Sequence, residues 1–424
     1  MSRFQKILLT LSIPVVLVGA LAGCSSDEAA DPTKEPAGNL TMWVRSGTAA
    51  QSQALVDAWN AGHERKIDLT VIPNENYLQK VGTAAGSNVL PDLLTSDGVF
   101  TPNYTEKGLF SDITEKVAVL PFKDGLVKAQ LDVGTYDGKQ FTVPHTTAVS
   151  ALFQNDVLLR KANIDPAAPV TSLEQLAKNA KAVAALGGDV KGMYLTGNNG
   201  GSIGFTVFPS VWASGGEVLD KEGTHAAVDS PEFVGVFDAL NAMYKDGSIA
   251  PSSREETGAT RDAVFSTGNV GYLLGSNSVL TNVKNSATME VGVKPIPGLT
   301  GGESTYVGGD VIGIAGSSEK QASAWEFLKW SLSDETQIDV MAKQGFLLSR
   351  TDLAENKYSS ADPRIVSLNK LVENGRIPFA LKYGETFSDA NGPWIIAARA
   401  AIFGEDAEAA LKNAKGGIDA SLKH

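Results

Sequence analysis

The sequence predicts an α/β fold divided into two lobes, and three observations lead to this prediction. Strand and helix patterns alternate along residues 40–97, which is typical of a parallel sheet with helical crossovers. The chain has 424 residues, and a folded part of about 390 residues exceeds the size at which one hydrophobic core stops growing. The pattern changes near residue 136, and from residue 157 onward the chain is rich in helix signals.

The first element is a secretory signal that ends at a lipoprotein cleavage site. Arg3 and Lys6 supply positive charge, an apolar run begins at Ile7, and Leu21-Ala22-Gly23-Cys24 closes it. The run is too short for a convincing membrane span. Cys24, the only cysteine, is therefore predicted to carry the lipid, the alternatives being an uncleaved anchor or a buried free thiol. The anchor would hold the chain on the extracytoplasmic face of the cell membrane.

Composition limits the partners of the chain. Residues 24–39 are rich in Pro, Ala and acids, so we expect a flexible tether. The formal net charge is −12, although residues 1–23 contain two basic and no acidic residues. A body this acidic is a poor match for nucleic acid. The four histidines are scattered without zinc-site spacing, so we expect no metal and no other cofactor.

The first folded half follows as strand, helix, strand, helix, strand. Strands are predicted at residues 40–44, 67–71 and 93–94, with a helix around residues 55–59 and another over residues 76–85. In open sheets of this kind, ligands bind beyond the carboxyl ends of the strands. The loops at those ends are residues 45–47, residues 74–76 and Asp97.

The remaining elements suggest that the chain passes between the lobes more than once. A turn at residues 136–139 precedes an apolar run at 149–153, and helices are predicted over residues 173–185 and 233–244. Strand signals return at 270–274 and 291–296, and apolar stripes at 322–332 and 397–411 indicate a helical last third. Two crossings follow from this order, with a third near residues 313–315.

Several short motifs, in a fixed order, carry a resemblance to a known family. They are Gly86–Leu93 with its Pro-Asp, Leu152–Leu158, Gly215–Asp220 with its Gly-Gly-Glu, Val228–Glu232, Phe265–Val270, Gly308–Ile314 and Trp325–Leu328. From about residue 40 to the C-terminus the chain resembles the extracellular solute-binding proteins of ABC sugar importers, the maltose-binding-protein-like group. It departs from the family at Pro169–Ser172, which lacks the usual tryptophan, and at Ser276-Asn277, where an aromatic residue is common. The identity of the ligand therefore does not transfer.

The resemblance implies a two-lobed periplasmic-binding-protein-like fold whose hinge is crossed three times. It places residues 40–148 and 272–315 in lobe I and residues 149–271 and 316–424 in lobe II. It also implies a monomer without catalysis that holds a sugar between the lobes and docks, when closed, on a membrane permease.

A sugar presents a hydroxyl rim and a C–H face, so its site needs carboxylates and amides for the rim and aromatic plates for the face. The candidate ligand-binding residues are Asn76, Asp97, Asn155, Trp212, Asp310 and Trp394, with Trp43, His145 and Arg350 as a second group. Each has a structural alternative. Asp97 and Asn76 sit where helix caps are common, and the tryptophans fit a core.

Two other functions stay open at this point. A carbohydrate-active lipoprotein enzyme would need a pair of carboxylates, which 48 acidic residues can supply, but the chain lacks a Gly-x-Ser-x-Gly elbow, a His-Glu-x-x-His motif and a phosphate loop. A binding protein for a peptide, a polyamine or an iron complex is the other alternative.

Overall fold

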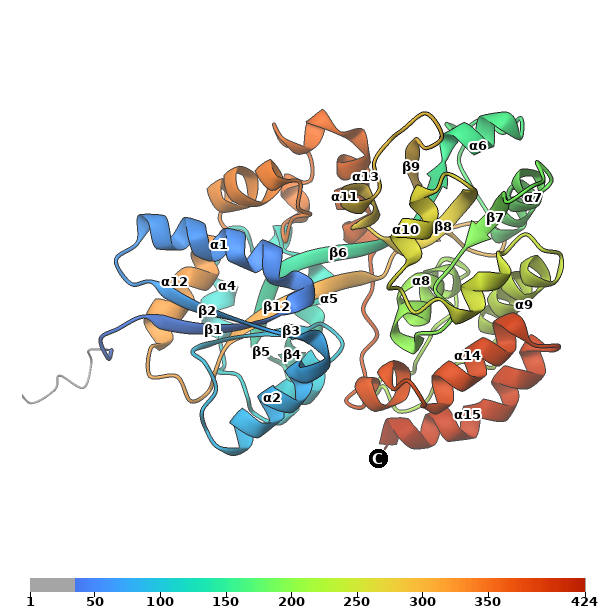
Figure 1. Cartoon of the computed structure of the whole chain (residues 1–424). Coiled ribbons are helices and arrows are strands. Elements are labelled where there is room, and N and C mark those ends of the chain that lie inside the picture. The colour runs from blue at the N-terminus through green and yellow to red at the C-terminus, as the bar shows by residue number, and fades with distance from the viewer. Residues whose placement is uncertain (1–34, 424) are drawn as a thin grey trace, which may run out of the picture. The chain divides into compact units, whose positions relative to one another are not determined.

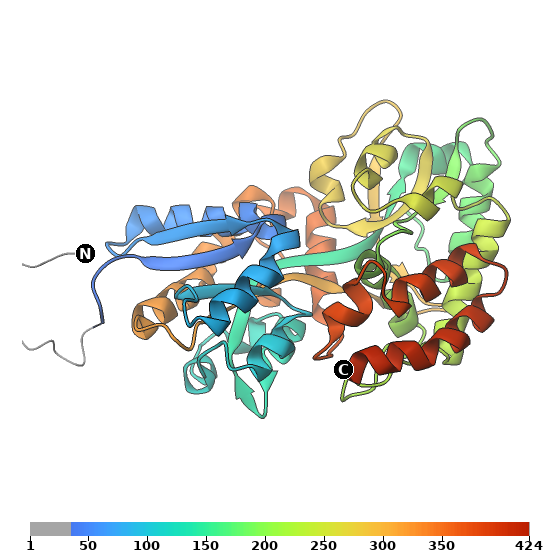
Figure 2. The same cartoon turned by 60° about the horizontal axis from the view of Figure 1, so that its bottom comes forward.

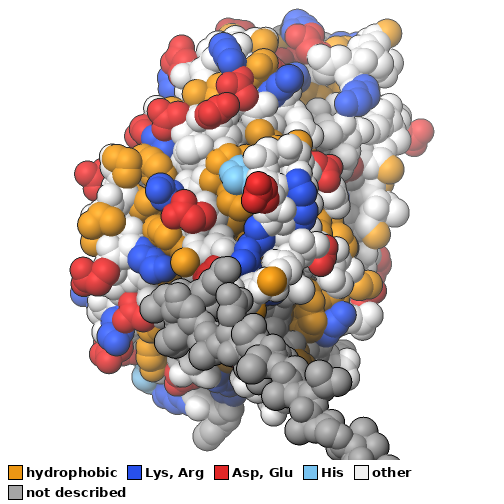
Figure 3. Space-filling view, turned by 90° about the vertical axis from the view of Figure 1, so that its left-hand side faces the viewer, with side chains coloured by type: hydrophobic (Ala, Val, Ile, Leu, Met, Phe, Trp, Pro, Cys, Tyr) orange, Lys and Arg blue, Asp and Glu red, His pale blue; other side chains and the backbone are white. Residues whose placement is uncertain are grey.

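The computed structural model describes residues 35–423 (Figure 1). The predicted signal peptide, Cys24 and most of the predicted tether lie outside the described residues. Among the helices of residues 35–423, none is both long and apolar enough to cross a bilayer. On the face shown in Figure 3, acidic and basic side chains are interspersed.

The first lobe is built on five strands in the order β2-β1-β3-β12-β6. They are β1 (Leu40–Arg45), β2 (Ile67–Ile72), β3 (Leu93–Asp97), β12 (Val307–Ile314) and β6 (Thr142–Asn155). The first strand runs parallel to β2 and β3, and β12 runs antiparallel to both β3 and β6. In β1, Leu40, Met42 and Val44 are buried while their neighbours are partly or fully exposed, as expected for a strand with one core face.

Helices cover this sheet, and two late segments among them were expected in lobe II. They are α1 (Ala49–Gly62), α2 (Asn74–Gly86), α3 (Thr101–Glu106), α4 (Thr114–Ala118) and α5 (Lys128–Val133), followed late in the chain by α12 (Gln321–Ser331) and the helical turn η4 (Thr336–Met341). Phe327 and Leu328 of α12 pack in the same apolar cluster as Leu40 and Met42. The sequence-based division puts residues 316–424 in lobe II, whereas this packing puts α12 with lobe I. An apolar stripe shows that a helix face is buried, but not against which sheet.

Strand β6 joins the lobes. Its first part pairs with β12, and its second part pairs with β8 (Val270–Ser276) and β9 (Val291–Lys294). Beyond β8 lies β7 (Lys191–Tyr194), parallel to it. Figures 1 and 2 both show β6 running from one lobe into the other. All 14 residues of β6 except Ala148 are buried, which is why its sequence reads as a nearly continuous apolar and small polar run.

The second lobe surrounds β7, β8 and the end of β6 with helices. Residues 272–294, which the sequence-based division puts in lobe I, lie here instead, because β8 and β9 pair with the second part of β6. The helices are α6 (Asp156–Lys161), α7 (Leu173–Ala184), α8 (Gly200–Ala213), α9 (Pro231–Lys245), α10 (Arg261–Ser266), α11 (Val279–Asn282), α13 (Pro363–Leu371), α14 (Pro393–Phe403) and α15 (Ala407–Lys423). Its core is aromatic, since Phe208, Phe233, Phe237 and Phe387 surround Trp394.

The chain crosses between the lobes three times, so the predicted two-lobed α/β fold is confirmed. Strand β6 is the first crossing, and the segment with β10 (Ile296–Pro297) and β11 (Glu303–Ser304) is the second. The third passes through Arg376 and not near residues 313–315 as the sequence suggests, because β12 pairs with β3 as far as Ile314 and so lies inside the first lobe. Backbone bonds tie the last two together, because Arg376 donates to the Thr305 carbonyl at 3.1 Å and Val307 donates to the Arg376 carbonyl at 3.0 Å. Two short hairpin strands, β4 (Thr135–Tyr136) and β5 (Lys139–Gln140), complete the first lobe.

Candidate functional site

The carboxyl ends of β1 and β3 meet β12 in a cluster of charges that we call the polar junction, formed by Arg45, Thr48, Asp97 and Asp310. Arg45 Nε lies 2.5 Å from Asp310 Oδ1, and its Nη2 lies 3.0 Å from Asp97 Oδ2. The Thr48 hydroxyl donates to Asp310 Oδ2 at 2.6 Å. Asp310 and Asp97 face each other in the β12–β3 register, so the sheet itself brings the two carboxylates to one arginine.

The two carboxylates of the polar junction differ in access. Asp310 is fully buried, whereas the side chain of Asp97 is 24% exposed. Burial raises the pKa of Asp97, and the charge of Asp310 adds to this, against the lowering effect of Arg45. Burial alone would lower the pKa of Arg45, but Asp310 and Asp97 raise it. Asp310 thus holds the guanidinium, and Asp97 is the more accessible of the two carboxylates.

His145 lies behind the polar junction, on β6. Its Nε2 is 2.9 Å from the Ser52 hydroxyl of α1, and its Nδ1 is buried without a partner among the described residues. Burial lowers the pKa of His145 to about 4, against a raising effect of Asp310. His145 is therefore neutral at neutral pH. It is one of the sequence candidates, and the structure places it inside the lobe and not at a surface.

The loop between β2 and α2 is exposed and lies beside the polar junction. Asn74 accepts a hydrogen bond from the Gly47 amide at 2.9 Å and lies 3.2 Å from the Ser46 hydroxyl. These two contacts of Asn74 hold the loop at the end of β1. The loop also lies close to Asn74, since a Cβ added at Gly47 would be 3.0 Å from the Asn74 amide nitrogen. Asn76, another candidate, lies two residues further on in the first turn of α2 and is exposed.

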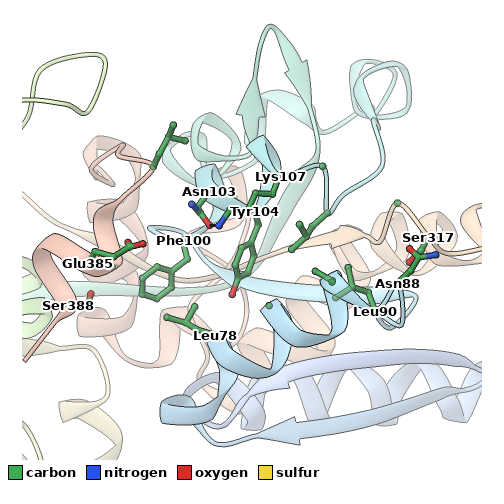
Figure 4. A pocket seen from close by; sticks show the side chains of 18 of the residues that line it. Leu78, Asn88, Leu90, Phe100, Asn103, Tyr104, Lys107, Ser317, Glu385 and Ser388 are labelled. Atoms are coloured by element: carbon green, nitrogen blue, oxygen red, sulfur yellow. Dashed lines mark hydrogen bonds between the residues drawn. The ribbon is translucent and has the colours of Figure 1, made fainter. Parts of the chain in front are cut away.

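A hollow of about 1220 Å³ lies between the first lobe and residues 381–389, and we call it the interlobe hollow (Figure 4). Asp97 is not one of its lining residues. Helices α2 and α3 form one wall and residues 381–389 form the other. Phe100 extends from the end of β3 towards the second wall. A Cβ on Gly384 would lie only 2.8 Å from its ring. Other residues that line the hollow are Leu78, Asn88, Leu90, Asn103, Tyr104, Lys107, Ser317, Leu381, Glu385, Ser388 and Asp389.

Two of the candidate residues lie in the core of the second lobe. Trp394 is fully buried and donates its indole N–H to the Gly200 carbonyl at 3.0 Å. Asn155 is also buried. Its amide donates to the carbonyls of Gly268 and Thr288, and its oxygen caps α6 at Val157. The structure does not bring either residue to the polar junction, and every described bond of the two side chains goes to the backbone.

The other candidates are dispersed. Trp212 is 8% exposed and lines a separate hollow of about 570 Å³, with the Arg376 guanidinium 5.2 Å from its ring centre. Trp43 is half-buried on β1, with Lys80 over its ring at 4.7 Å. Arg350 is buried in the first lobe, where it binds Asp334 at 3.0 Å and the Leu332 carbonyl.

Sequence reasoning did not single out two residues of the site, Arg45 and Phe100. The sequence pattern does place residues 45–47 in a loop at the end of a strand, and this was sufficient to predict where Arg45 lies. The partner of the arginine, however, is 265 positions away in the sequence. No group of three or more histidine, cysteine or acidic side chains that could hold a metal ion occurs within residues 35–423.

Two lobes joined by three segments, with a polar junction and a hollow between them, define the class of proteins that hold a ligand between two α/β halves. The chain belongs to the bacterial extracellular solute-binding protein family, whose pattern matches residues 45–338. This family consists of binding proteins for transport and not of enzymes.

Individual relatives agree with this assignment. The diacetylchitobiose binding protein DasA of Streptomyces coelicolor is 24% identical over 375 residues, which cover 84% of this chain and 85% of that protein. Among solved structures, the sugar-binding protein MalE of Xanthomonas citri has a TM-score of 0.80 at 17% identity, covering 91% of this chain and 97% of its own. The cyclic alpha-maltosyl-1,6-maltose binding protein of Arthrobacter globiformis has a TM-score of 0.77 at 21% identity, covering 92% and 100%.

Proposed function

We propose that this chain is the lipid-anchored solute-binding component of an ABC importer, which captures a mono- or oligosaccharide between its lobes and delivers it to a membrane permease. The observation that supports this most is the position of Asp97, a partly exposed carboxylate at the carboxyl end of β3, in the polar junction with Arg45 and Asp310. The named relatives bind diacetylchitobiose, a maltose derivative and sugars.

In this proposal Asp97 and Asn76 contact the ligand, and Asp310 keeps Arg45 in place. A carboxylate accepts two hydroxyl hydrogen bonds, which suits the rim of a sugar ring. Closure of the lobes follows from ligand contacts on both sides, because a ligand shifts a conformational equilibrium only when it binds one state better.

Calorimetric titration of the full chain in detergent tests this proposal. The probes are glucose with its maltooligosaccharides and N-acetylglucosamine with its chitooligosaccharides. We expect heat of binding for one series, and a loss of about tenfold or more in affinity with Asp97→Asn, since a hydrogen bond to a charged group contributes about 1.5–3 kcal/mol. Asp246→Asn is the control, because Asp246 is also partly exposed but pairs with Lys181 in the second lobe. Absence of binding to every saccharide, with binding to a polyamine or a peptide, would refute the proposal.

The lipid anchor on Cys24 is a separate part of the proposal, supported by the order of charge, apolar run and Leu-Ala-Gly-Cys in the sequence. We propose a monomer held at the extracytoplasmic face of the membrane. Labelled palmitate supplied to expressing cells should appear on the wild-type chain and not on Cys24→Ala. Equal labelling of both would exclude the anchor.

A further inference from the structure

Arg376, on the third crossing, is held to the second crossing by its backbone. The bonds with Thr305 and Val307 described above place it in parallel register beside Tyr306. The two segments are also packed closely, since a Cβ added at Gly375 would lie only 2.2 Å from Val307 Cγ2. The backbone of Arg376 therefore cannot shift against the second crossing without breaking these bonds.

The second crossing is bonded in turn to β6, the first crossing, through Ser150. The Ser150 amide donates to the Tyr306 carbonyl at 3.1 Å, and the Tyr306 amide donates to the Ser150 hydroxyl at 2.9 Å. The Thr305 hydroxyl donates to the Ser150 carbonyl at 2.7 Å. All three residues are buried, where a hydrogen bond is costly to leave unmade. The three crossings thus form one hydrogen-bonded unit at this level.

The side chain of Arg376 leaves this unit and reaches the second lobe. Its guanidinium forms an ion pair with Glu217, in the loop after α8, and lies 5.2 Å from the ring centre of Trp212 near the end of α8. A planar guanidinium suits both partners better than an ammonium group would. The side chains of Arg376 and Glu217 are 42% and 58% exposed. Because water screens such a pair, it is weak enough to break when the lobes move.

The next residue, Ile377, lies against the first lobe. A Cβ added at Gly98 would be 3.0 Å from Ile377 Cδ1, and Gly98 directly follows Asp97. Ile377 also packs against the apolar cluster of the second lobe that contains Trp212. Arg376 and Ile377, which we call the hinge pair, therefore connect the strand end that carries Asp97 with the second lobe.

We propose that the hinge pair sets the separation of the lobes in the unliganded chain, and through it the affinity for the ligand. Both residues act without touching the ligand, so they are positioning residues. Loss of either contact lets the lobes separate further. A chain that spends a smaller fraction of time in the competent arrangement binds its ligand more weakly by that fraction. This inference rests on the proposed function only for the affinity measurement.

Distances between spin labels on the two lobes test the inference without any ligand. The labels are attached at Glu64→Cys, just after α1, and at Lys178→Cys, on α7, since both positions are exposed. The full chain carries Cys24→Ser, so that no other thiol reacts. Arg376→Gln should broaden the distance distribution towards longer separations. Ile377→Ala, which removes the contact with the first lobe, should do the same.

Arg160→Gln is the matched control, because Arg160 forms a similarly exposed ion pair with Glu290 inside the second lobe. It should leave the distance distribution unchanged. Glu217→Gln should act in the same direction as Arg376→Gln. The double variant should show no larger effect than Arg376→Gln alone, because the two side chains act as one pair. Arg376→Lys, which keeps the charge but not the planar group, should lie between the wild type and Arg376→Gln.

Calorimetric titration with maltose and with diacetylchitobiose measures the effect on binding. For the sugar that binds, Arg376→Gln should lower the affinity about two- to fivefold, as expected for an exposed ion pair with a cation–π contact. Unchanged distances in both Arg376→Gln and Ile377→Ala would overturn the inference, as would an equal change in Arg160→Gln or broadened distances with unchanged affinity. Broadened distances in a chain that binds no saccharide would refute the proposed function and leave the role of the hinge pair in lobe separation intact.

Discussion

The two lobes differ in the side chains that fill the space behind the ends of their strands. In the first lobe the strand ends carry the polar junction, where three charges lie together, Asp310 fully buried and Arg45 and Asp97 partly exposed. In the second lobe the space behind the strands is filled by aromatic rings around Trp394. The ring centres of Trp394 and Phe208 lie 5.2 Å apart. The strand ends of one lobe therefore carry charged groups, whereas the other lobe is packed with aromatic rings.

Residue type alone does not identify a ligand contact. Tryptophans are expected as plates for a sugar face, yet Trp394 is part of a core. The half-buried ring beside the candidate site is a phenylalanine, Phe100. Trp394 and Phe100 lie on elements whose faces have different surroundings. Those surroundings depend on how distant segments of the chain pack together.

A substitution in the aromatic cluster of the second lobe should destabilise the chain most. Trp394→Ala removes the centre of a packed cluster and the bond to Gly200, so it should lower the free energy of unfolding by about 3–5 kcal/mol. Trp43→Ala, at a half-buried tryptophan, should cost clearly less. Chemical denaturation measures both, and equal losses would show that the second-lobe cluster is not the main support.

Breaking the polar junction should come next. Asp310→Ala leaves the Arg45 guanidinium without its fully buried partner and should destabilise the chain by about 3 kcal/mol. Asp97→Ala should have a smaller effect on stability, because Asp97 is partly exposed and its pKa is already raised. Denaturation of both variants tests this ranking, which the reverse order would contradict.

Acid should weaken the first lobe through His145. The pKa of His145 in the folded chain is lowered to about 4 from 6.5, so between these pH values the unfolded chain binds the proton first. Stability is therefore lost as the pH falls from about 6.5 to 4, by about 2–3 kcal/mol from this residue. The difference in unfolding free energy between wild type and His145→Gln, measured from pH 7 to pH 4, should shrink by this amount. A difference independent of pH would exclude the effect.

The smallest effect is expected from a charge pair outside the junction. Lys128 and Asp132 lie 2.6 Å apart on α5, and both side chains are largely exposed. Lys128→Ala should change stability by about 0.5 kcal/mol or less, because water screens such pairs. Thermal unfolding measures this, and a loss as large as that of Asp310→Ala would show that burial does not set the strength of these charge pairs.

Part of the site was predictable because it depends on local order. Strand ends at residue 45 and at Asp97 follow from alternating apolar residues, and parallel strands bring such ends to one edge. Pairing of Arg45 with Asp310 was not predictable in the same way, because it requires β12 to insert between β3 and β6. The spacing of these residues along the sequence does not indicate that β12 inserts there.

The α/β alternation, the presence of two lobes and the family were predictable from the sequence, because each depends on the order of short patterns along the chain. The tertiary structure alone decided that α12 packs in the first lobe, that Trp394 is enclosed and that Phe100 faces the interlobe hollow. The physical reason is that periodicity specifies which face of an element is apolar, whereas the surface that buries this face is set by contacts between segments far apart in the chain.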